Sequence, residues 1–113
     1  MLDKTQLTQY TLKLHPDTLI KIKIFTAMDS DIQYQYEFFD KAVKWAKENT
    51  DHLVALANSK EGSNRSYYLS KGTKLIKGLE EALDCNTTRA LYTAIIAYLS
   101  FRELEEKSAT VVC

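Results

Sequence analysis

The stretch YTLKLHPDTLIK, Tyr10 to Lys21, decides the fold, because a stretch of the same design, RSYYLSKGTKLIK, recurs at Arg65 to Lys77. In each, a few residues alternate between apolar and polar, a short break follows, and Leu-Ile-Lys enters a helical pattern. Alternation with a period of two is typical of a half-buried strand. A chain of 113 residues therefore carries one strand-to-helix design twice.

The first copy continues into two predicted helices. Pro16 lacks an N–H, so it ends the strand at 10–14 and suits the first turn of a helix. Residues 19–28 carry apolar side chains at helical spacing. Residues 38–49, FFDKAVKWAKEN, put apolar side chains on one face and lysines on the other, which indicates an amphipathic second helix.

A different structure of the same half stays open at this point. Ile20, Ile22 and Ile24 alternate with lysines, and DIQYQYEFF at 31–39 alternates in the same way. This pattern is also that of strands, and strand propensity depends strongly on context. The alternative fold class is therefore α+β, with an N-terminal β-meander that turns at HPD and MDSD.

The second copy is predicted as a strand at 66–70, a break at Lys71-Gly72-Thr73, a helix near 75–83 and a helix over 89–107. Thr73 is the expected N-cap of the first of these helices, and a residue of Asn86–Thr88 caps the second. The polar stretch NSKEGSN, 58–64, separates the copies. The predicted divisions are a first unit at 1–57, a linker at 58–64, a second unit at 65–107 and a tail at 108–113.

Each copy resembles a ribbon-helix-helix unit of the Arc/MetJ/CopG type. The resemblance rests on YTLKLHPDTLIKIKIFTAMDSD with EFFDKAVKWA, and on SYYLSKGTKLIKGLEEALDCNTT with RALYTAIIAYL. It implies a mainly α fold, with two such units in one chain sharing a two-stranded antiparallel ribbon. Strand 10–14 would lie against strand 66–70, because one strand with two helices cannot bury its apolar face alone. The side chains expected to face inward are Tyr10, Leu12, Leu14, Tyr67 and Leu69.

The resemblance implies double-stranded DNA as the partner, with the ribbon in the major groove. Glutamine suits adenine there, lysine suits guanine, and serine or threonine suits either. Any half-exposed strand also turns polar residues outward, so a purely structural role for each residue stays open. The residues expected to read base edges are Gln9, Thr11, Lys13, Asn64, Ser66 and Tyr68.

Phosphate contacts are expected at basic residues that flank the ribbon and at the start of the second helix of each unit, where a helix dipole favours an anion. In the first unit that start is MDSDI, where Asp29 and Asp31 would repel a phosphate, so Ser30 or Asp31 is expected to cap the helix instead. The residues expected to contact phosphates are Arg65, Lys71, Thr87, Thr88 and Arg89.

The composition indicates a protein without a strong overall electrostatic field. Fifteen basic and fifteen acidic residues cancel, which counts against a polyanionic partner. The charge is uneven, however, since 60–77 is basic and 80–106 is acidic. The chain shows no signal sequence and no long apolar run, so we expect a cytoplasmic protein without a membrane partner.

The sequence contains no clear catalytic motif. His15 and His52 are far apart in sequence, Cys85 has no evident base beside it, and no glycine-rich phosphate loop is present. We therefore expect no enzyme and no cofactor or metal. The predicted function is that of a repressor or a plasmid or phage accessory protein, with several chains possible on adjacent half-sites. The alternative is a small helical protein–protein interaction module that does not bind DNA.

Overall fold

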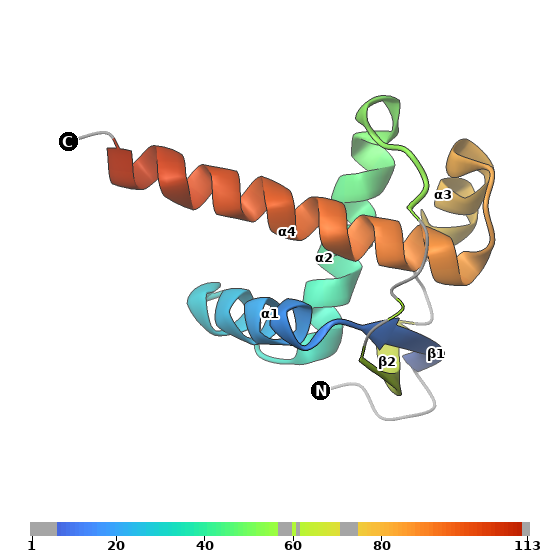
Figure 1. The fold of residues 1–113 in the computed structure, drawn as a ribbon, viewed down its shortest axis with the longest axis horizontal. Helices are drawn as coiled ribbons and strands as arrows, with labels where there is room; N and C mark the ends of the chain where they lie inside the picture. Colours follow the sequence, from blue (N-terminus) through green and yellow to red (C-terminus); the bar gives the residue numbers. More distant parts are fainter. Residues whose placement is uncertain (1–6, 57–59, 61, 71–74, 112–113) are drawn as a thin grey trace.

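The structure is a computed structural model that describes residues 7–56, 60, 62–70 and 75–111. The order strand, helix, helix occurs twice along the chain (Figure 1). The described part of the chain is therefore mostly helical with a two-stranded antiparallel sheet, which agrees with the coarse prediction of fold class but does not show the predicted pair of ribbon-helix-helix units. Its elements are β1 (Leu7–Leu14), α1 (Pro16–Met28), α2 (Gln35–Glu48), the 3-10 turn η2 (Thr50–His52), β2 (Ser63–Ser70), α3 (Leu75–Leu83) and α4 (Thr87–Val111).

The two strands pair antiparallel, which confirms the pairing expected from the repeated design. The register places Tyr10 opposite Tyr67 and extends from Leu7 opposite Ser70 to Leu14 opposite Ser63. Both strands are longer than predicted, and residues 63 and 64 belong to β2 rather than to the linker. Four of the side chains expected to face inward are buried and the fifth, Tyr10, is partly buried against the core.

The first half is helical, so the β-meander alternative is wrong. Pro16 occupies the first turn of α1, and the His15 Nδ1 atom accepts a hydrogen bond from the Asp17 N–H at 3.1 Å. Within α1, Ile22 and Phe25 are buried, whereas Ile20 and Ile24 are exposed. A spacing of three between the buried positions is that of a helix face, and the isoleucine alternation came from apolar residues on the exposed face.

The turn between α1 and α2 differs from the prediction. The second helix begins at Gln35, and its N-cap residue Tyr34 makes no side-chain capping bond, so the expected capping by Ser30 or Asp31 is wrong. Asp29 instead ends α1, where its N–H donates to the Phe25 carbonyl. Asp31 lies three residues before the N-cap position, and its carboxylate pairs with Lys41 at 2.8 Å.

In the second half, Asp84 adopts a positive φ of 51° directly after α3, a left-handed residue that stops a helix. Asn86 then caps α4, since its Oδ1 atom accepts from the Arg89 N–H at 2.9 Å. This agrees with a cap within Asn86–Thr88. The fourth helix continues to Val111, past the predicted end at 107, because no glycine or proline interrupts it.

The two halves share one hydrophobic core rather than forming separate units. Helix α2 lies against β2 and crosses α4 (Figure 1). Aromatic rings join the halves, since Phe39 packs edge-on against Tyr67 at 5.4 Å and Phe38 lies 5.5 Å from Tyr98. Among the described residues, no helix has both the length and the apolar character needed to cross a membrane.

Candidate nucleic-acid interface

The side of the ribbon opposite the core carries all six predicted base-reading residues. In the register, Gln9 lies opposite Tyr68, Thr11 opposite Ser66, and Lys13 opposite Asn64. Directly opposed residues of an antiparallel pair point to the same face. Lys13 and Tyr68 are half-buried and the other four are exposed. We call this surface, made by Gln9, Thr11, Lys13, Asn64, Ser66 and Tyr68, the outer face of the ribbon.

The outer face consists of hydrogen-bonding groups without a negative charge. It offers two amides, two aliphatic hydroxyls, a phenol and an ammonium group. Neither β1 nor β2 contains an acidic residue, and their only charged residues are Lys13 and Arg65. The chain is neutral as a whole, but its ribbon is positive. One contact already orders this surface, since the Gln9 amide donates to the Ser66 hydroxyl at 2.7 Å.

Contacts with the helices fix the ribbon in place. Asp40 of α2 accepts hydrogen bonds from the Ser70 N–H at 3.0 Å and from its hydroxyl at 2.6 Å, which holds the end of β2. Burial raises the pKa of Tyr67, and its hydroxyl has no hydrogen-bond partner among the described residues. Burial, with the charge of Glu80 second, also raises the pKa of Tyr10. Both phenols are therefore neutral, and they pack against the core on the inner face of the ribbon.

The residues predicted to contact phosphates do not share one surface, unlike the predicted base-reading residues. Arg65 is exposed and lies opposite Leu12, so it points to the other side of the ribbon from the base-reading residues. Thr87 and Thr88 form the first turn of α4 and are half-buried. Lys71 lies outside the described residues.

Arg89 has a structural role that sequence reasoning missed. Its Nε atom donates to the Leu56 carbonyl at 3.1 Å and its Nη2 atom to the Ala55 carbonyl at 3.4 Å. The Leu56 N–H in turn donates to the Thr93 hydroxyl at 2.9 Å. These bonds attach the segment before β2 to the start of α4. The guanidinium is therefore already engaged, and a phosphate would share it with two backbone carbonyls.

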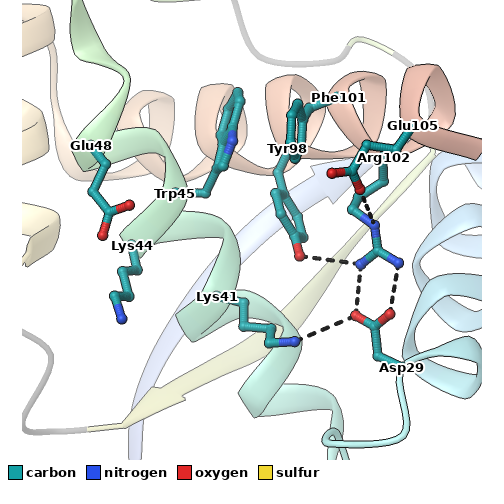
Figure 2. Close-up of a pocket in the computed structure, with 9 residues that line it drawn as sticks. All are labelled: Asp29, Lys41, Lys44, Trp45, Glu48, Tyr98, Phe101, Arg102 and Glu105. Atoms are coloured by element: carbon teal, nitrogen blue, oxygen red, sulfur yellow. Dashed lines mark hydrogen bonds and ion pairs between the residues drawn. The ribbon is translucent and has the colours of Figure 1, made fainter. Parts of the chain in front are cut away.

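A cleft of about 450 Å³ lies between α2 and α4, and its lining residues belong to neither β1 nor β2 (Figure 2). Three aromatic rings line it, and Trp45 stacks on Phe101 with 5.1 Å between ring centroids. Its charged residues are three acids and three bases, so the cleft has no net charge. The residues that line it are Asp29, Lys41, Lys44, Trp45, Glu48, Tyr98, Phe101, Arg102 and Glu105.

The charges of the cleft are largely paired with one another. Arg102 binds Asp29 through two contacts of 2.7 Å and also donates to the Tyr98 hydroxyl at 3.2 Å (Figure 2). Hydrogen bonding from Arg102 holds the pKa of Asp29 below its ordinary value, and the same bond raises the pKa of Arg102. Lys41 lies 3.6 Å from the Asp29 carboxylate. The arrangement stabilises the fold and offers no excess charge for a ligand.

These cleft residues were not predicted as a group. Asp29 and Arg102 are 73 positions apart, and no spacing rule connects them. Within the described residues, no group of three or more His, Cys, Asp or Glu side chains is placed to hold a metal ion.

Comparison with known proteins does not assign the chain: no family model, no curated protein and no solved structure matches it.

Proposed function

We propose that this protein binds double-stranded DNA by inserting the outer face of its ribbon into the major groove, as a ribbon-helix-helix pair within one chain. One observation carries the proposal: six hydrogen-bonding side chains form three cross-strand pairs on a ribbon that has no acidic residue. The major groove, about 12 Å wide, admits a two-stranded ribbon. The base-reading residues are those six.

The chemistry of each pair suits base edges. The amides of Gln9 and Asn64 match the donor and acceptor of adenine, and the ammonium of Lys13 matches the two acceptors of guanine. Arg65, Lys71, Thr87, Thr88 and Arg89 supply phosphate contacts, and the affinity they add falls with salt. The protein acts as a repressor or as a plasmid or phage accessory protein, in the cytoplasm and without a cofactor or an enzymatic activity.

A protein–protein interaction module is the second candidate, because α1 presents apolar side chains to solvent. Ile20 is 55% exposed, and Ile24 and Met28 are each 50% exposed. They follow one another at intervals of four residues, so they lie along one side of the helix. The neutral overall charge also fits a partner that is not a polyanion.

Fluorescence anisotropy with a randomised duplex pool, at low and near-physiological salt, tests the proposal. We expect salt-sensitive binding and enrichment of a short sequence from the bound fraction. The double variant Lys13→Ala, Tyr68→Ala should bind the enriched sequence at least about tenfold more weakly, since one good base contact contributes about 1–3 kcal/mol of discrimination.

The matched control is Lys23→Ala, which removes one exposed positive charge from α1 and leaves the ribbon intact. Its affinity for the enriched sequence should stay within about twofold. Absence of binding at low salt would remove DNA as the partner and direct attention to the exposed side of α1.

A further inference from the structure

The outer face of the ribbon has an approximate two-fold symmetry. An axis normal to the ribbon through the pair Thr11–Ser66 exchanges the two strands of an antiparallel ladder. The same axis exchanges Gln9 with Asn64 and Lys13 with Tyr68. On the inner face it superimposes the buried Leu12 on Tyr67 and Leu14 on Leu69, but it exchanges the partly buried Tyr10 with the exposed Arg65, so the symmetry of the inner face is partial.

The exchanged residues are chemically alike in two of three cases. Gln9 and Asn64 are both amides, and Thr11 and Ser66 are both hydroxyls. The third case breaks the symmetry, because Lys13 is a cation with donors only and Tyr68 is a neutral phenol. Each end of the ribbon therefore has one amide, but only the end with Lys13 and Asn64 has an ammonium group.

The asymmetry is permanent, because both strands belong to one chain. In a ribbon made by two identical chains, each strand carries the same residues and an isologous pairing makes the two ends equal. Here β1 and β2 are different sequences joined through α1 and α2, so the two ends stay different in every molecule.

We propose that one chain reads an imperfect palindrome. Each arm of this DNA site contains an adenine that the protein reads, but only one arm contains a guanine that it reads. Adenine is read in both arms, by Gln9 in one and by Asn64 in the other, while guanine is read by Lys13 in a single arm. The chain thus binds its target in one orientation. This inference rests on the proposed function and names the kind of DNA site that the ribbon takes.

Two converse substitutions test this inference in the full-length protein. Tyr68→Lys gives both ends a lysine, and Lys13→Tyr gives both ends a tyrosine. Each variant and the wild type are used to select sites from a randomised duplex pool, with the stoichiometry of each complex measured by light scattering. Circular dichroism reports whether each variant keeps the wild-type helical content.

For the wild type we expect one chain per site and guanine enriched in one arm, and replacement of that guanine should weaken binding by about tenfold or more. Tyr68→Lys should enrich guanine in both arms, and Lys13→Tyr should enrich it in neither, with adenine retained in both arms. A wild-type site with guanine in both arms at one chain per site overturns the inference, as does a Tyr68→Lys site unchanged from the wild type.

The outcomes separate this inference from the proposed function. If no protein enriches any sequence, DNA reading itself is wrong. If sequences are enriched but the two substitutions leave their symmetry unchanged, DNA reading stands and the assignment of one arm to Lys13 is wrong.

Discussion

Arg102 is a charged residue held by several contacts. It forms the paired contacts with Asp29 described above, and its guanidinium lies over the Phe25 ring at 5.0 Å. The Arg102 and Asp29 side chains are only 12% and 10% exposed. Removal of one member of such a pair leaves a poorly solvated charge behind, which costs more than the pair contributes. This contact fixes α4 against the end of α1.

We therefore predict that Arg102→Ala destabilises the protein by about 3 kcal/mol, the low end of the range for breaking a buried ion pair, because Lys41 still lies 3.6 Å from the Asp29 carboxylate. The matched control is Lys21→Ala, which breaks the exposed contact with Glu103 at 2.8 Å and should cost less than about 1 kcal/mol. Urea unfolding of the two variants and the wild type measures the difference. Equal losses in the two variants would show that the buried position of Arg102 does not matter.

The same pair predicts a pH dependence of stability. The pKa of Asp29 lies below its ordinary value of 3.8, chiefly because Arg102 donates to the carboxylate. The stabilising effect of ionised Asp29 is therefore complete above the ordinary value and is lost as pH falls through the lowered one. Between about pH 4 and pH 2 the free energy of unfolding should fall more steeply in the wild type than in Asp29→Asn. Parallel curves over this window would contradict the assignment.

At the scale of elements, substitution of two glycines by alanine measures how much space the fold leaves for a Cβ atom at each position. Gly62 precedes β2 with a φ of 99°, and a Cβ atom there would overlap the Leu14 carbonyl oxygen. Gly62→Ala should cost at least about 1–3 kcal/mol from backbone strain alone. Gly78 lies inside α3, where a Cβ atom would meet the flexible end of Lys47, at 2.6 Å from its Cε atom.

Gly78→Ala should consequently leave the protein equally stable or up to about 1 kcal/mol more stable, because alanine favours a helix and Lys47 can move aside. Thermal unfolding followed by circular dichroism compares the two variants. A destabilised Gly78→Ala would show that Lys47 is held rigidly between α2 and α3.

Helix α1 shows why periodicity alone left two interpretations open. Ile20, Ile22 and Ile24 alternate like a strand, yet only Ile22 is buried. The buried partner at helical spacing is Phe25, and the sequence contained that signal as well. Two apolar residues on the exposed side of a helix were enough to imitate a strand, because periodicity does not report which apolar residues find a partner.

At the scale of the whole molecule, the shared core predicts a single cooperative unfolding transition. Trp45, the one tryptophan, lies on α2 and stacks on Phe101 of α4, so its fluorescence reports contact between the halves. Far-ultraviolet circular dichroism reports all helices. The two signals should give the same midpoint in urea, since neither half retains a core without the other. Separate midpoints would indicate that the halves fold independently.

The sequence by itself determined the two strands and their pairing, although it left the first half open between helices and a β-meander. A strand-and-helix design repeated within one short chain predicted two strands with unsatisfied apolar faces, and burial of those faces required them to pair. The pairing placed Gln9, Thr11, Lys13, Asn64, Ser66 and Tyr68 on one surface, as expected. Alternation along a strand is local, so these residues could be assigned to a face before any tertiary contact was known.

Only the tertiary structure decided which charged residues support the fold. Arg89 holds the carbonyls of Ala55 and Leu56, and Asp29 binds Arg102, and neither contact was predicted from the sequence. Long polar side chains reach across the molecule to groups distant in sequence, and no periodicity encodes that reach. Apolar spacing thus predicts which apolar faces pack together. That packing then decides which charged side chains come into contact.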